Sequence, residues 1–179
     1  MNALSNETKL KIEKTIKNLK ANKMDAYYCD NKEDACNLVK TLIKKGDVIS
    51  SGGSVTLKET GVYDIITSSD YKYLDRAAEG ITPEEVEEVY HKTFSSDVYF
   101  ASSNAITENG ELYNVDGNSN RVAAILYGPK SVILVCGYNK IVKNIDEAID
   151  RVKRIAAPSN TIRLNIETPV SYTHLTLPT

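Results

Sequence analysis

The sequence predicts an α/β domain in which helices flank a mainly parallel β-sheet. Short apolar runs typical of strands alternate along the chain with amphipathic stretches typical of helices. The composition, 41% hydrophobic and 26% charged residues, is that of a soluble globular protein. The length of 179 residues is sufficient for one domain with a substantial core.

The first part of the chain predicts a helix, a strand and a second helix. Residues 9–20 place aliphatic side chains among lysines at loosely helical spacing. Residues 24–29 form a short apolar and aromatic run, which we interpret as the first strand. Residues 31–34 then offer a helix start, and the apolar stripe that follows ends before Gly46, a natural helix stop.

The next stretch predicts a strand, a Gly-rich turn and a short helix. Residues 47–50 are the strand, and they lead directly into the Ser-Gly-Gly-Ser sequence of residues 51–54. A short helix over residues 55–60 opens at the end of this turn. Residues 62–67 are apolar enough to be another strand or an extended segment, whereas residues 70–80 have no clear pattern.

A strong helix start lies at residues 82–85. Thr82 can cap the helix, Pro83 suits its first position, and glutamates face the positive end of the helix dipole. The helix should extend to about residue 94. It carries His91 near glutamates, which is thin support for a metal site, and a solvated charged face is the preferred interpretation.

The remaining elements complete the alternation of strands and helices. Residues 97–101 predict a strand, and residues 131–136 read as the most clearly buried strand of the chain. Residues 144–155 predict a final amphipathic helix that stops near Pro158. In a parallel sheet of this kind, ligands bind beyond the carboxyl ends of the strands.

The first polar loop at such a strand end is formed by residues 51–54. Glycines permit close approach of the backbone, and Ser54 at a helix start would leave amide groups available for an anion such as a carboxylate or phosphate. The alternative is a tight turn with Ser54 as an ordinary helix cap. Because the loop is neither a P-loop nor a dinucleotide-binding fingerprint, spacing alone leaves both interpretations open.

The second polar segment, residues 102–122, is dense in Asn, Gly and small hydroxyl residues. Asn109-Gly110 favours a two-residue type I′ hairpin flanked by strands at residues 105–107 and 112–115. Arg121 falls in the first turn of a following helix, where a cation opposes the dipole and needs a separate reason. One hypothesis is that several of its side chains converge with Gly52 and Gly53 around a pocket; they are Asn104, Asn114, Asp116, Asn120 and Arg121. The alternative is that they only satisfy turns and caps.

Charge and composition exclude several classes of function. The net charge of −2 predicts no general attraction for nucleic acid or anionic membranes. No apolar run is long enough to span a bilayer, and the N-terminus has a charged helical pattern rather than that of a signal peptide, so we expect a cytoplasmic protein. The three cysteines form no C-x-x-C pair, and Cys136 reads as a small core residue.

Three motifs in order closely resemble the LUD-domain family of lactate-utilization proteins, of the LutC/YkgG type. They are S-S-G-G-S-V-T-L-K-E-T-G, then A-I-T-E-N-G-E-L-Y-N-V-D-G-N-S-N-R-V-A-A-I-L-Y-G-P, then V-I-L-V-C-G-Y-N-K-I-V. The resemblance covers most of the chain and implies the NagB/RpiA/CoA-transferase-like fold. That fold is a three-layer, Rossmann-like, mainly parallel sheet with flanking helices. We therefore expect one LUD domain over residues 1–170.

The resemblance also implies which residues line a small-molecule site. Three loops correspond by motif to ligand-lining loops of that fold, and their candidate ligand-binding residues are Gly52, Gly53, Ser54, Asn104, Asn114, Gly117, Asn120, Arg121, Gly137, Asn139 and Lys140. The candidate catalytic residues are Asp116 and Glu108, because isomerases of this fold need an acid/base carboxylate near the ligand. No residue is assigned to a metal. Lys140 is equally compatible with a solvated loop lysine.

The function implied by the resemblance is that of a subunit in an L-lactate oxidation system. It would bind a small acidic, phosphate-bearing or CoA-type ligand, while partner subunits carry iron–sulfur cofactors and this chain carries none. Two alternatives stay open, an independent sugar-phosphate isomerase or CoA-transferase-like enzyme and a non-catalytic assembly or regulatory module. The oligomeric state is also open, with a homo-oligomer among the options.

The last residues depart from the family pattern. Residues 171–179 contain no Asp, Glu, Lys or Arg and differ from the short Cys-bearing segment in which many small members of the family end. We therefore interpret this tail as non-native or disordered and assign no role to His174.

Overall fold

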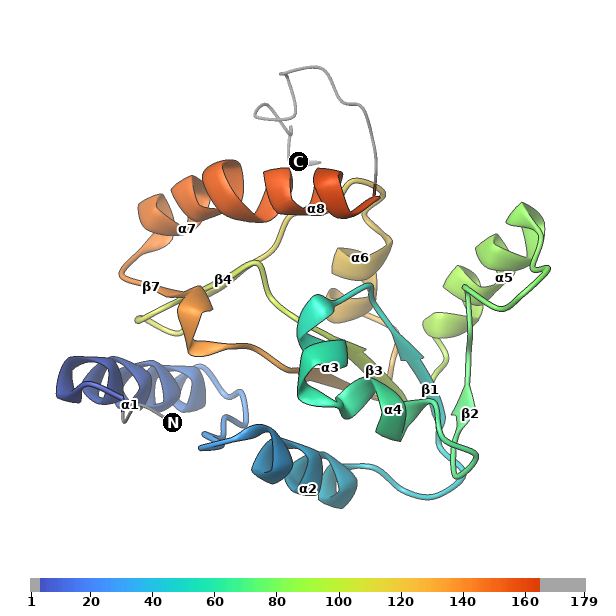
Figure 1. The fold of residues 1–179 in the computed structure, drawn as a ribbon, viewed down its shortest axis with the longest axis horizontal. Helices are drawn as coiled ribbons and strands as arrows, with labels where there is room; N and C mark the ends of the chain where they lie inside the picture. The colour runs from blue at the N-terminus through green and yellow to red at the C-terminus, as the bar shows by residue number, and fades with distance from the viewer. Residues whose placement is uncertain (1–3, 165–179) are drawn as a thin grey trace. The chain divides into compact units, whose positions relative to one another are not determined.

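The structure, a computed structural model, describes residues 4–164 (Figure 1). The chain divides into two compact units. The four-stranded unit contains the segments Cys29–Ser102 and Asp116–Cys136. The three-stranded unit contains Ser103–Val115 together with the described parts of the N-terminal segment up to Tyr28 and of the C-terminal segment from Gly137. The predicted tail at residues 171–179 lies outside the described residues.

The sheet of the four-stranded unit is entirely parallel, with strand order β2-β1-β3-β6. Its strands are β1 (Val48–Ser51), β2 (Lys72–Tyr73), β3 (Val98–Ala101) and β6 (Ser131–Leu134). Because β3 has a neighbour on each side and helices above and below, all four of its residues are buried. This is the environment in which a strand needs a continuous apolar sequence.

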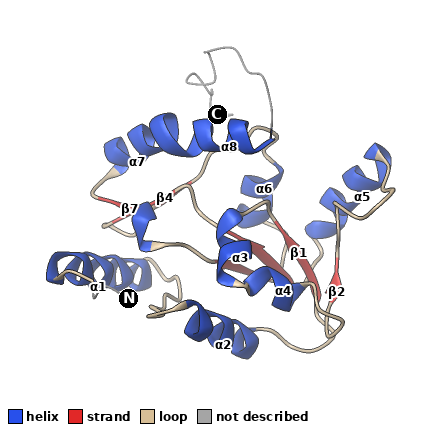
Figure 2. Cartoon of the chain, in the orientation of Figure 1, coloured by secondary structure: helices blue, strands red, loops and turns tan. Residues whose placement is uncertain are grey.

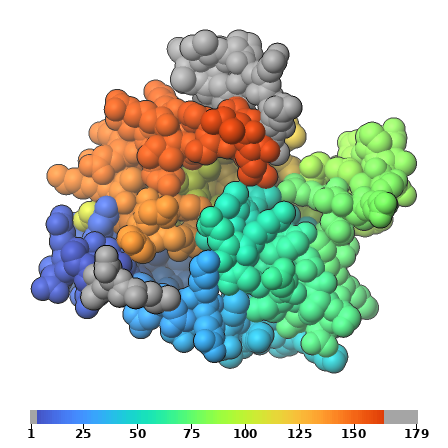
Figure 3. Space-filling view, in the orientation of Figure 1, coloured from blue at the N-terminus to red at the C-terminus, as the bar shows by residue number. Residues whose placement is uncertain are grey.

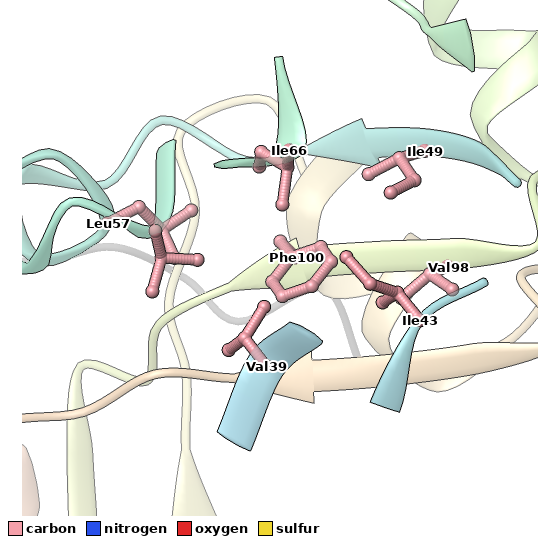
Figure 4. Packing of buried hydrophobic residues seen from close by; sticks show 8 residues of the cluster. Val39, Ile43, Ile49, Leu57, Ile66, Val98 and Phe100 are labelled. Atoms are coloured by element: carbon pink, nitrogen blue, oxygen red, sulfur yellow. The ribbon is translucent and has the colours of Figure 1, made fainter. Parts of the chain in front are cut away.

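One face of this sheet packs against α2 (Lys32–Leu42), α3 (Val55–Thr60) and α4 (Val62–Ile66). Side chains alternate along a strand, so Val98 and Phe100 of β3 point to this face. Figure 4 shows Phe100 among Val39, Ile66 and other aliphatic side chains from these helices. In Figure 2, α3 and α4 lie over the strands of the sheet.

The opposite face of the sheet packs against α6 (Asn120–Leu126) and the end of α5 (Pro83–Thr93). Tyr99 and Ala101 of β3 point this way and contact Ala124 of α6. A buried hydrogen bond of 2.7 Å joins the hydroxyls of Ser50 in β1 and Thr93 in α5. Helices therefore cover both faces, which confirms the predicted three-layer, Rossmann-like arrangement with a mainly parallel sheet.

Helix α5 begins as the sequence predicts. The Thr82 hydroxyl accepts a hydrogen bond from the Glu85 backbone N–H, and the Glu85 carboxylate accepts one from the Thr82 N–H, which together form a capping box. Pro83 occupies the first turn. Helix α5 extends outward at the edge of its unit, where it forms the light-green segment of Figures 1 and 3. His91 is exposed near Glu87, so its interpretation as part of a solvated face is confirmed.

The three-stranded unit is built on a mixed sheet of order β5-β4-β7. Its strands are β4 (Ala105–Thr107), β5 (Leu112–Tyr113) and β7 (Ile141–Val142). Its helical elements are α1 (Asn6–Ala21), a 3-10 turn (Tyr138–Lys140), α7 (Ile145–Arg151), a π-helical turn (Val152–Ala156) and α8 (Ala157–Leu164). A small core forms where Ala105, Val142 and Ala148 meet beside Tyr113.

The hairpin predicted at Asn109-Gly110 is present, but its turn type is not the predicted type I′. The Gly110 N–H donates to the carbonyl of Thr107, and Thr107 pairs with Glu111 across a three-residue loop. A type I′ turn needs a positive φ at both central residues, but only Gly110, with a φ of +85°, has one, whereas the φ of Asn109 is negative. The loop is therefore one residue longer than predicted.

Two of the predicted strands are not strands. Residues 62–67 form helix α4, because Val62 and Ile66 are four residues apart and both are fully buried on one helical face. Residues 24–29 belong to neither a helix nor a strand, and the rings of Tyr27 and Tyr28 are exposed. A short apolar run does not by itself distinguish a strand from a helix.

Two further predictions differ in extent. Strand β6 is half-buried rather than fully buried, because it lies at the edge of the sheet and pairs only with β3. The last helix does not stop near Pro158. A π-helical turn, in which the Ala157 N–H donates to the Val152 carbonyl, precedes the proline, and helical structure continues as α8. Pro158 lies in the first turn of α8, where its missing N–H costs little.

Candidate functional site

The strand order of the four-stranded sheet creates a switch point between β1 and β3. From β1 the chain moves outward to β2 and then returns to place β3 on the other side of β1. Ligands of open α/β sheets bind beyond the carboxyl ends of the strands at such a point. Here Gly52 follows β1 and Ser102 follows β3, and the Gly52 N–H donates to the Phe100 carbonyl at 2.8 Å.

Gly52 permits two side chains to approach the backbone at the switch point. A Cβ atom at this position would lie 2.9 Å from the hydroxyl oxygen of Tyr99 and 3.2 Å from Cγ and Cδ of Arg121. The first distance is shorter than real Cβ contacts, so no larger residue fits without movement. The glycine therefore serves to bring Tyr99 and Arg121 against the end of β1.

Arg121 and Asp116 form a partly buried ion pair beside Gly52. The Arg121 Nε donates to Asp116 Oδ1 at 2.8 Å, and Nη1 donates to the Ser102 carbonyl at 2.8 Å. The second carboxylate oxygen of Asp116 accepts the Val122 backbone N–H at 2.7 Å. Asp116 thus takes the place of an ordinary side-chain cap for α6. It also explains why Arg121 is tolerated in the first turn, where a positive charge opposes the helix dipole.

A small polar hollow opens on the α5 and α6 side of this sheet. Its volume is about 10 Å³, which is enough for one water-sized group. Its lining residues come from all the elements around the strand ends; they are Ser50, Ser51, Arg76, Tyr90, Thr93, Tyr99 and Asn120. The guanidinium carbon of Arg76 lies 5.7 Å from the centre of the Tyr90 ring, within the range of a cation–π contact.

Tyr99 stays neutral at physiological pH. Burial raises its pKa to about 12, against the opposing influence of the positive charges of Arg76 and Arg121. Burial likewise raises the pKa of Tyr73 to about 12, although that hydroxyl is hydrogen-bonded to Ser51 at 2.7 Å. A neutral phenol can donate a hydrogen bond, so Tyr99 offers the hollow a donor rather than a negative charge.

Of the residues predicted to form the site, four come together here. Gly52, Asp116 and Arg121 are in contact as described, and Asn120 lines the hollow beside Tyr99. Ser54, in the same unit, accepts the Leu57 N–H as the cap of α3, in agreement with the ordinary-cap interpretation. The other glycines of these two loops, Gly53 and Gly117, are exposed.

The remaining predicted residues belong to the three-stranded unit. The side-chain oxygen of Asn114 accepts the Asn104 N–H, and that of Asn104 accepts the Val115 N–H at 2.9 Å, so the two asparagines brace this segment. Glu108 forms a 2.9 Å ion pair with Lys14 of α1. The third loop places its candidates around the 3-10 turn; they are Gly137, Asn139 and Lys140.

The match to a family decides where this chain belongs. Residues 12–176 match the sequence model of the LUD domain. The chain belongs to the LUD-domain family. No curated protein and no solved structure matches it. The family is associated with lactate utilization, as the resemblance of the three motifs implies.

Six of the seven residues that line this LUD domain's hollow are absent from the predicted site, which includes only Asn120 among them. Arg76 lies in the stretch of residues 70–80 that has no clear pattern, and Tyr90 lies on a helix whose charges dominate its sequence. The direction of the Tyr99 side chain could have been inferred from strand alternation. Val98 and Phe100 point to one face of the sheet, so Tyr99 between them points to the other. A tyrosine inside a fully buried strand, level with a Gly-Gly turn, is the signal that could have found it.

Two findings on residues 4–164 complete the description of this LUD domain. Within that range, no group of three or more His, Cys, Asp or Glu residues is arranged to hold a metal ion. No helix in the same range is long and apolar enough to cross a bilayer.

Proposed function

We propose that this LUD-domain chain binds a small organic acid at the switch point of its four-stranded sheet, as a subunit of an L-lactate-oxidising system. The observation that carries the proposal is the cluster of Gly52, Tyr99 and the Arg121–Asp116 pair at the carboxyl ends of β1 and β3. A close backbone approach, a neutral hydroxyl donor and a fixed guanidinium are the groups that recognise a small anion. Membership of the LUD-domain family supports lactate or its product as the acid.

The proposed system divides the chemistry between subunits. Oxidation of L-lactate to pyruvate removes two electrons and two protons, so an electron acceptor is required. In the proposal, partner subunits with iron–sulfur cofactors accept the electrons, and this chain contributes binding of the acid. The alternatives of an independent enzyme and of a non-catalytic module are then outcomes of the same ligand test.

The contacts of the two candidate catalytic carboxylates favour binding over acid/base catalysis. Both oxygens of Asp116 accept hydrogen bonds, one from Arg121 and one from the Val122 N–H. A carboxylate whose two oxygens are both engaged in this way is poorly placed to exchange a proton with a ligand. In the proposal Asp116 is a positioning residue for Arg121, while Glu108 pairs with Lys14 in the other unit.

Thermal unfolding with a panel of ligands tests the proposal. A ligand that binds only the folded protein stabilises it by about 2.7 kcal/mol at about one hundred times its Kd. We expect L-lactate or pyruvate to raise Tm, and D-lactate, ribose 5-phosphate and acetyl-CoA to have smaller effects. Stabilisation by the sugar phosphate or the CoA ester alone would instead support an isomerase or a transferase. No effect from any compound would support a non-catalytic module.

Co-purification tests the proposed association with iron–sulfur partner subunits. The tagged chain, expressed in cells that grow on L-lactate, should co-purify with iron–sulfur proteins that show the visible absorbance of their clusters. Co-purification that is equal in cells grown on glucose and on L-lactate would contradict a dedicated role in lactate oxidation.

A further inference from the structure

We propose that Arg76, Tyr99 and Asn120 form a receptor for the carboxylate group of a small monocarboxylate, which enters the hollow carboxylate-first. This inference rests on the proposed function, because it assigns the residues that would hold the acid at the same switch point. Arg76 is the new element, and neither its position in the sequence nor the family motifs single it out.

The Tyr99 hydroxyl is a hydrogen-bond donor that faces the hollow. Tyr99 is only 2% exposed, yet among residues 4–164 its hydroxyl has no hydrogen-bond partner. The neighbouring hydroxyls are satisfied, since Ser51 pairs with Tyr73 and Ser50 pairs with Thr93. Since no fully buried side-chain N or O atom among residues 4–164 lacks a partner, the Tyr99 hydroxyl is open to the hollow and can donate to a group that enters it.

The two arginines near the hollow differ in how their charges are balanced. The positive charge of Arg121 is neutralised by Asp116 at 2.8 Å. Arg76, in contrast, has no carboxylate partner within residues 4–164, and its contact is with the face of the Tyr90 ring. An arginine remains protonated at all physiological pH values. The hollow therefore has one uncompensated positive charge beside the donors of Tyr99 and Asn120.

The hollow matches a single carboxylate in size and in charge. A volume of about 10 Å³ admits one water-sized group, such as one oxygen of a carboxylate. A single unpaired guanidinium matches a singly charged carboxylate, with which arginine forms paired hydrogen bonds. A phosphate monoester is bulkier and carries more charge than this hollow compensates. The structure thus favours a short-chain acid whose remaining atoms lie outside the hollow.

Calorimetric titration of the full chain with acetate, L-lactate, pyruvate and inorganic phosphate tests the receptor. Arg76→Gln removes the charge and Tyr99→Phe removes only the hydroxyl. Lys58→Gln is the matched control, because Lys58 also lies over a tyrosine ring, 5.4 Å from that of Tyr63, but does not line the hollow. We expect Arg76→Gln to raise the Kd for carboxylates about tenfold to a hundredfold. Tyr99→Phe should raise it about tenfold, and Lys58→Gln should leave it unchanged.

The outcomes separate this inference from the proposed function. If L-lactate binds and Arg76→Gln has no effect on its Kd, the receptor is wrong and the proposed function stands. If acetate binds as well as L-lactate and both lose affinity in Arg76→Gln, the receptor stands and lactate recognition fails. If phosphate alone binds, or if no carboxylate binds the unmodified chain, the receptor is overturned. Circular dichroism of each variant checks that it is folded.

Discussion

Gly52 matters at the scale of single residues because of what surrounds it. The Tyr99 hydroxyl and the Arg121 side chain both approach within contact distance of the place where a Cβ atom would lie. Asp116 holds Arg121 in turn through Nε and also fixes the first turn of α6. One small residue therefore leaves room for both the Tyr99 hydroxyl and the Arg121 side chain at the end of β1.

Gly52→Ala tests this packing directly. We expect the substitution to lower the free energy of unfolding by about 1–3 kcal/mol, because overpacking forces neighbouring groups to move. In a Tyr99→Phe background, which lacks the oxygen 2.9 Å from the new Cβ atom, the cost should fall by about 1 kcal/mol. Urea denaturation of the two single variants and the double variant measures this difference. Strictly additive costs would contradict the contact.

The predicted residues that lie together at the switch point are those that carry local signals in the sequence. Gly52, Asp116 and Asn120 belong to turns, and Arg121 drew attention because its charge opposes a helix dipole. Arg76 and Tyr90 carry no such signal, since their role depends on how a loop and a helix pack beside a sheet. Tertiary packing of this kind cannot be predicted from residue type and spacing in one sequence.

At the scale of elements, capping residues and strand alternation predicted helices and strands correctly, whereas short apolar runs did not. The Thr82 capping box and the alternation along β3 appear as predicted. The prediction of a strand or extended segment at residues 62–67 was wrong, because the two buried residues are four positions apart, a spacing that suits a helix. The hairpin at Gly110 was right in position but wrong in turn type, because pairing of Thr107 with Glu111 adds one residue to the loop.

Two glycines with the same backbone conformation allow strain and packing to be separated. Gly46 has a φ of +89°, and a Cβ atom added there would have no other atom within 4 Å. Gly110 has a φ of +85°, and a Cβ atom added there would lie 2.7 Å from the α1 backbone at Asn18 and Leu19. Gly46→Ala should therefore cost about 1 kcal/mol, the strain of a left-handed conformation.

Gly110→Ala should cost about 3 kcal/mol, because displacement of α1 adds to the same strain. Urea denaturation of both variants measures the difference. Equal costs for the two substitutions would show that α1 does not pack on the hairpin as described.

At the scale of the whole molecule, the chain passes between its two units after residues 28, 102, 115 and 136. Each unit is therefore assembled from segments that are distant in the sequence. The fold class and the family could be predicted because strand alternation and three motifs extend over most of the chain. The site depends on the switch point that this topology creates.

Nuclear magnetic resonance titration of the labelled full chain with L-lactate tests the central claim most directly. We expect the largest shift changes at the backbone amide of Gly52 and at the side chains of Arg76, Tyr99 and Asn120, all within the four-stranded unit. Shift changes that saturate with L-lactate but are confined to the three-stranded unit would contradict the account, as would no change at any residue.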